Sequence, residues 1–125
     1  MVLQGLDRTR QAEYWIGIGI AQRALGRVER AIGTLSEAET HLQEALQTFT
    51  SHGFRPEAAR THLDMATVAH AQGNAAATAT HLYQAHMLFT TLQAPAYVER
   101  TAQLARDYGM TLPNTTLEAP AQDKA

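Results

Sequence analysis

The sequence predicts an all-α fold in which antiparallel helical hairpins stack as a short solenoid of about five helices. Apolar residues recur at helical spacing through most of the 125 residues, and glycine or proline interrupts them. Segments 40–50 and 80–90 share Thr-His-Leu at their start, followed by Ala, Phe and Thr at the same offsets. Self-similarity at such a period is typical of stacked repeat proteins, whose units bury their apolar faces against their neighbours.

The first helix is expected over residues 10–32, which contain no proline and follow a flank at residues 1–9. The positions that recur at helical spacing are Trp15, Ile18, Gln22, Leu25, Val28 and Ile32. Glycine inside a helix costs roughly 1 kcal/mol relative to alanine. Close approach of a neighbouring helix is therefore the expected reason for Gly17, Gly19 and Gly26.

The second helix is expected from about Ser36 to Thr50, with the Ser36 hydroxyl as its cap. Its apolar stripe repeats in the fourth helix, which is expected over residues 75–92. The stripe residues are Leu35, Ala38, Leu42, Ala45, Leu46 and Phe49, then Ala79, Leu82, Ala85, Leu88 and Phe89.

The third helix is expected over residues 57–72, where Pro56 pre-sets its start, and a fifth over 97–108, with Gly109 ending it. Short turns at Gly33 and Gly73 predict antiparallel pairs, and longer loops of equal length are expected between the pairs. The domain is thus expected at 10–109, with repeats at about 17–56 and 57–96 and a closing helix at 97–109. Residues 110–125 show no periodicity, and we expect a disordered tail.

The composition excludes several classes of function. The formal net charge of -2 provides no basic field for nucleic acid or an anionic membrane. The absence of cysteine removes disulfides, zinc–thiolate sites and cysteine nucleophiles. The N-terminal residues lack the apolar segment of a signal peptide, and no stretch reaches about 18 consecutive apolar residues. We therefore expect a cytoplasmic protein with neither a nucleic-acid nor a membrane partner.

The polar residues form no catalytic or metal-binding pattern. His81 and His86 are five positions apart, which does not place two ligands on one helix face. Asp64 has no second acid at a paired spacing on its face, and Gly17-Ile18-Gly19 lacks the preceding strand of a phosphate-binding loop. We predict that the chain is not an enzyme and has no metal or cofactor.

The chain resembles the tetratricopeptide repeat family. The residues that carry the resemblance are Leu25-Gly26, Gly33, Ala38, Leu42 and Ala45 in the first copy, and Met65-Ala66, Gly73-Asn74, Leu82 and Ala85 in the second. The 40-residue step is longer than the family's usual step of about 34, and it resembles looser variants in C-terminal regions of bacterial signalling ATPases, nucleotide cyclases and LuxR-type or MalT-type regulators. A second register, ranked lower, places Trp15, Ile18 and Gly19 on the Trp-x-x-Leu-Gly signature and a turn at Gly26-Arg27.

The resemblance implies a protein-interaction module whose partner-binding groove is lined by the first helix of each pair. The positions that resemble this lining are Arg23, Arg27, Arg30, Arg60, Thr67, His70, Arg100 and Gln103. Arg23, Arg27 and Arg30 share one helix face, and arginine binds carboxylates bidentately, so an acidic segment or a C-terminal carboxylate is the expected partner. The alternative is that these are solvated charges that pair with Glu29 or Asp64.

The first helix also predicts self-association, because it is apolar on nearly all sides. The residues concerned are Tyr14, Trp15, Ile16 and Ile18, together with Ile20. A repeat array needs about three units and polar ends, whereas this chain has about two and a half. Either a second copy or further repeats should cover that end. The alternative function is accordingly a regulatory, sensor or structural segment of a larger signalling enzyme or transcriptional regulator.

Overall fold

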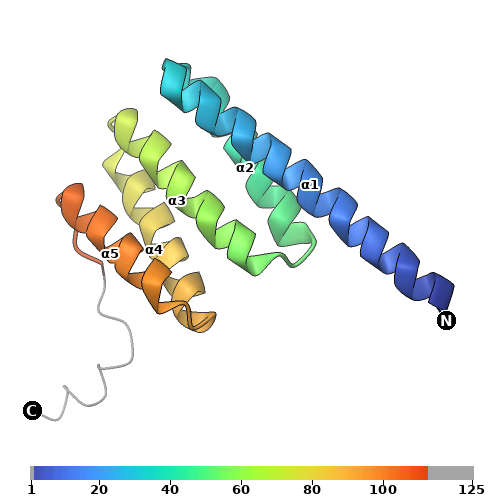
Figure 1. Cartoon of the computed structure of the whole chain (residues 1–125). Helices are drawn as coiled ribbons and strands as arrows, with labels where there is room; N and C mark the ends of the chain where they lie inside the picture. Colours follow the sequence, from blue (N-terminus) through green and yellow to red (C-terminus); the bar gives the residue numbers. More distant parts are fainter. Residues whose placement is uncertain (1, 113–125) are drawn as a thin grey trace, which may run out of the picture.

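The computed structural model describes the backbone of residues 2–112 and the side chains from residue 7 onward, and the described chain is all-α with no strand (Figure 1). The prediction of the fold class is confirmed. The five helices are α1 (Val2–Ile32), α2 (Leu35–Ser51), α3 (Arg55–Ala71), α4 (Ala75–Thr91) and α5 (Pro95–Asp107).

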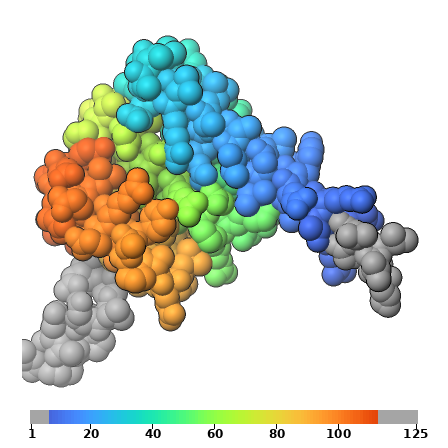
Figure 2. Space-filling model, viewed as in Figure 1, coloured from blue at the N-terminus to red at the C-terminus, as the bar shows by residue number. Residues whose placement is uncertain are grey.

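Successive helices run antiparallel, and α1, α3 and α5 form one row with α2 and α4 behind it (Figure 1). α1 packs chiefly on α2, α3 on α4, and α5 on α4, whereas α1 and α3 have few contacts. α1 is 31 residues long and begins at Val2, well before the expected start at Arg10. Its N-terminal half projects beyond the rest of the molecule in Figures 1 and 2. No described helix meets the length and apolarity that crossing a bilayer requires.

The helices follow one another at a regular 20-residue step. Thr34, Phe54, Asn74 and Ala94 are the residues immediately before α2, α3, α4 and α5. The first three of these helices have 17 residues each, so α2 and α4 are offset by the same 40 positions as the repeated segments. The expectation of longer loops between pairs is wrong, because residues 52–54 connect two pairs and 72–74 connect one pair with equal length.

Each helix ends in a tight turn that satisfies its last carbonyl groups. The backbone N–H of Phe54 donates to Phe49 O at 2.8 Å, and Met110 N–H likewise donates to Ala105 O at 2.8 Å. This bond belongs to a left-handed cap, which glycine adopts without steric cost. Gly109 has φ 71° as expected, whereas Gln93 takes φ 55° without being glycine.

The start of α2 differs from the prediction. The helix begins at Leu35 and its N-cap is Thr34, whose side chain makes no capping hydrogen bond, so Ser36 is not the cap. Asn74 is the residue that caps by its side chain, because its Oδ1 accepts from Ala77 N–H at 3.0 Å.

Most of the predicted stripes of α2 and α4 lie in the core, but Ala79 is exposed and its neighbour Thr78 is buried in its place. Ala38, Leu42, Ala45 and Phe49 are buried, and so are the residues 40 positions later, namely Thr78, Leu82, Ala85 and Phe89. Met110 and Leu112, which we expected in the tail, pack against the cluster that contains Leu82, Ala85 and Phe89. The remainder of the predicted disordered tail, residues 113–125, lies outside the described residues.

The inward face of α1 is small and polar rather than apolar. Among its residues with a described side-chain environment, the buried ones are Gly19, Arg23 and Gly26. A Cβ atom at Gly19 would overlap the Phe49 ring, and one at Gly26 would overlap Leu42. Close helix approach thus explains these two glycines but not Gly17, whose Cβ would meet open space. The second register is wrong, because α1 continues through Gly26 and Arg27 without a turn.

Candidate partner-binding groove

Two of the predicted partner-binding arginines tie α1 to α3. Arg23 is 7% exposed, and its Nη2 lies 2.8 Å from Glu57 Oε1 while its guanidinium covers the Phe49 ring at 5.2 Å. Arg27 Nε donates to Asp64 Oδ2 at 2.8 Å. The three arginines of α1 therefore do not form one free face, because Arg23 is turned inward and Arg27 is already paired. The alternative, that an arginine pairs with Asp64, is confirmed for Arg27.

The other predicted residues are distributed over α1, α3 and α5. Arg30 is exposed, and its charge makes a small contribution against the burial that raises the pKa of Asp64. Arg60 Nη1 donates to Glu57 Oε2 at 3.3 Å and lies over the Tyr97 ring at 5.1 Å. Arg100 is 5.8 Å from the same ring. His70 stacks on Tyr108 at 3.8 Å.

A groove of about 610 Å³ runs between α3 and α5 and contains three of the predicted residues, Thr67, Arg100 and Gln103. Leu63 and Leu104 supply its apolar surface, and both also belong to or pack against the core cluster of α3, α4 and α5. The lining residues that the sequence reasoning missed are Asp64, Ala96, Glu99 and Asp107, in addition to these leucines.

Carboxylates dominate the charge of this groove. Asp64, Glu99 and Asp107 line it, and Arg100 is the only lining residue of opposite charge among those described. Burial raises the pKa of Asp64, and the neighbouring Arg27 counteracts this by favouring the ionised carboxylate. Arg106 Nη2 donates to Glu99 Oε2 at 2.8 Å, and Gln103 Nε2 donates to Asp107 Oδ1 at 2.8 Å. These contacts hold the acidic rim on α5 in place.

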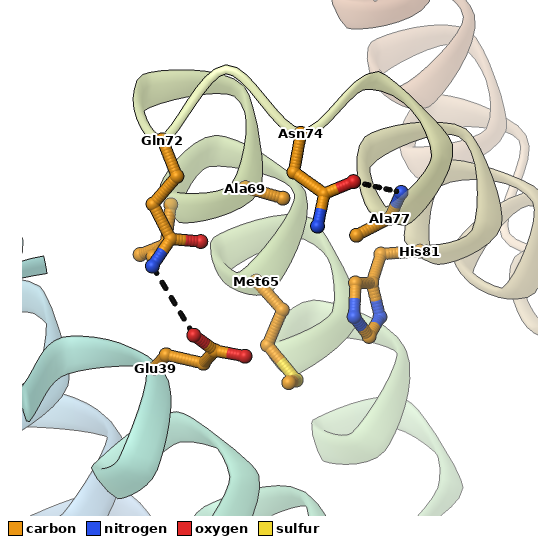
Figure 3. Close-up of a pocket in the computed structure, with 8 residues that line it drawn as sticks. Glu39, Met65, Ala69, Gln72, Asn74, Ala77 and His81 are labelled. Carbon is orange, nitrogen blue, oxygen red and sulfur yellow. Dashed lines mark hydrogen bonds between the residues drawn. The ribbon is translucent and has the colours of Figure 1, made fainter. Parts of the chain in front are cut away.

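A second, much smaller cavity lies where α2, α3 and α4 meet (Figure 3). Its side chains include Glu39, Met65, Gln72, Asn74 and His81, and Gln72 Nε2 donates to Glu39 Oε1 at 3.1 Å. The cavity volume of about 30 Å³ has room for little more than one water molecule. It is not a site for a peptide or an organic ligand.

The histidines contact other side chains of the chain. His62 Nδ1 and His81 Nδ1 are 3.0 Å apart between α3 and α4, so one ring donates to the other only while at least one of them is neutral. Burial and the neighbouring His81 lower the pKa of His62 to about 4. His41 Nδ1 lies 2.6 Å from Glu29 Oε1, and this hydrogen bond raises the pKa of His41. Within the described residues no three His, Cys, Asp or Glu side chains are placed to hold a metal ion.

The residues predicted for self-association divide between the two sides of α1. Trp15 stacks on His52 at 4.4 Å, and Ile16 packs against the cluster of Ala45, Phe49 and Ala58. Tyr14 is 60% exposed, and Ile18 is half-buried. Among the described large aliphatic residues of α1, the most exposed are Leu25, Val28 and Ile32, which recur at the spacing from which a buried face was expected.

Comparison with protein-family models, with curated proteins and with solved structures gives no match for this chain. The groove and the outer face of α1 are therefore the features from which function is inferred.

Proposed function

We propose that this chain is a protein-interaction module that binds a segment of a partner protein in the groove between α3 and α5. The observation that carries the proposal is an open groove of about 610 Å³ with leucines beneath polar walls. Binding sites of this size commonly combine an apolar surface with a few polar groups that fix orientation. The resemblance to tetratricopeptide repeats supports the same location, since their partner groove is lined by the first helix of each pair.

The charge of the groove favours a segment that carries lysine or arginine. An acidic partner was expected on the assumption that several arginines are free, but Arg23 and Arg27 are held by Glu57 and Asp64. An acidic segment would meet Asp107 at the α5 wall, which forms no ion pair with a described residue, and like charges across an interface are unfavourable. We therefore propose a basic segment in place of the acidic one.

Selection from a random peptide library displayed on phage tests both parts of the proposal. The selected peptides are then titrated, by fluorescence anisotropy, against the native chain and against Thr67→Arg, which fills the groove. Thr40→Arg is the control. In both threonines the side-chain hydroxyl donates a hydrogen bond to the backbone carbonyl four residues earlier, at 3.1 Å in each case. Thr40 lies on α2, outside the groove.

The expected result is a set of peptides that contain lysine or arginine. Their affinity should fall at least tenfold for Thr67→Arg, equivalent to about 1.4 kcal/mol, and stay unchanged for Thr40→Arg. Removal of one carboxylate in Asp107→Asn should weaken binding a few-fold and reduce its dependence on salt. Peptides that bind Thr67→Arg as well as the native chain would rule out the groove. Selection of acidic peptides would contradict the proposed charge.

A further inference from the structure

The outer face of α1 carries a continuous apolar stripe with the spacing of a coiled-coil seam. We define the α1 stripe as six residues separated alternately by four and three positions: Tyr14, Ile18, Ala21, Leu25, Val28 and Ile32. Tyr14, Leu25, Val28 and Ile32 are 60%, 45%, 56% and 69% exposed. A heptad seam of this kind is the pattern by which two helices pack side by side.

No charged side chain interrupts the α1 stripe, because the charges of this part of the helix are directed elsewhere. Arg23 and Arg27 contact Glu57 and Asp64 on α3, and Glu29 contacts His41 on α2. The exposed residues along one side of the stripe are small, namely Gly17, Ala24 and Ala31, and on the other side the exposed Trp15 is stacked on His52. A second helix can therefore approach α1 closely, and this helix must itself be apolar and uncharged.

We propose that a second copy of this chain covers the stripe, with the two α1 helices antiparallel about a twofold axis. In this register Tyr14 lies opposite Ile32 of the second copy, Ile18 opposite Val28, and Ala21 opposite Leu25. The stripe is self-complementary, since every residue has an apolar counterpart and the smallest one faces the bulky Leu25. A twofold axis uses the same patch on both copies, so neither is left uncovered.

The size of the stripe indicates a weak dimer. Nineteen residues of helix from Tyr14 to Ile32 extend about 28 Å, and one helix face is about 10 Å wide. The resulting area is small beside the roughly 800 Å² per copy of a standard stable interface. The dimer is therefore expected to dissociate on dilution.

Sedimentation equilibrium of the full chain over a range of concentrations tests the inference. The native chain should shift from monomer to dimer as its concentration rises, and Leu25→Glu should weaken that association at least tenfold. Met87→Glu is the matched control, because Met87 is a 36% exposed apolar residue on α4 and outside the stripe. A native chain that stays monomeric at the highest workable concentration overturns the proposal, as does equal weakening by Met87→Glu. Thr67→Arg should leave the dimer unchanged, which separates this test from that of the groove.

Disulfide trapping tests the antiparallel register, and the native chain contributes no cysteine to it. Ile18→Cys and Val28→Cys chains should each stay uncrosslinked under mild oxidation and crosslink when mixed. Crosslinking of Ile18→Cys alone would indicate a parallel pair and overturn the register.

Discussion

Replacement of His62 by glutamine should remove a large part of the chain's sensitivity to acid. His62 is half-buried against His81, and burial and the neighbouring His81 lower its pKa from 6.5 to about 4. Glutamine is a mild substitution, because Gln22 occupies the position 40 residues earlier and its Oε1 accepts a hydrogen bond from Thr48 at 2.9 Å.

The sign of the effect follows from proton binding. Between about pH 6.5 and pH 4 the unfolded chain binds a proton at residue 62 and the folded chain does not, so the free energy of unfolding decreases as the pH falls. The difference between the two pKa values corresponds to about 3 kcal/mol as an upper limit. His62 keeps some contact with solvent, so we expect about 2 kcal/mol of this between about pH 7 and pH 4.5.

Urea denaturation followed by far-UV circular dichroism at those two pH values measures the effect. The native chain should lose about 2 kcal/mol more than His62→Gln on acidification. Glu39 and the pair of His41 and Glu29 are present in both proteins, so their contributions largely cancel in the comparison. Burial also lowers the pKa of His81, and its ring contacts residue 62 in the native chain alone, so the measured difference belongs to the pair of His62 and His81. An equal loss in the two proteins would refute the assignment of the low pKa to His62.

Three further substitutions, two of them with a comparison variant, test the packing and the turns by the same urea assay. Gly19→Ala should destabilise the chain by about 1 to 3 kcal/mol, because the new Cβ overlaps the Phe49 ring and this outweighs the better helix propensity of alanine. An unchanged urea midpoint would contradict the close approach of α1 to α2. Gln93→Gly should stabilise it by about 0.5 to 1 kcal/mol by relieving the positive φ, whereas Gln93→Ala should not. Arg23→Ala should cost about 3 kcal/mol because the poorly solvated Glu57 then keeps only its longer contact with Arg60. Arg27→Ala should cost less than about 1 kcal/mol because that side chain is 50% exposed.

The helices of the core could be predicted because local pattern and tertiary packing agree in them. In α2 the spacing of Ala38, Leu42, Ala45 and Phe49 predicts one apolar face, and that face is buried. The turns could be predicted for a related reason, since Gly33, Gly53 and Gly73 adopt the positive φ that glycine favours. The start of α1 could not, because no proline or capping residue marks where that helix begins.

The orientation of α1 was mispredicted because the fully buried residues of its contact face are two glycines and an arginine. Hydrophobic periodicity assigned Leu25 and Val28 to the interior, yet both are exposed. Gly19 and Gly26 were the available signal, since they are one heptad apart and fit closely against α2. The acidic lining of the groove depends on which helices become neighbours, and residues such as Asp64 and Asp107 meet only once α3 and α5 are packed.

α1 and α3 differ in the residues that they place at positions related by the 40-residue offset. The residues 40 positions after Arg23 and Glu57 are Leu63 and Tyr97, which belong to or pack against the apolar cluster of α3, α4 and α5.

An ion pair between α1 and α3 thus corresponds to apolar packing between α3 and α5. Ion pairs contribute little net stability after desolvation. α1 is therefore attached by close glycine contacts and two ion pairs while it presents its aliphatic residues to solvent. Among the described side chains, α1 leaves more large apolar residues exposed than any other helix, which is the physical reason that a second copy is proposed to pack there.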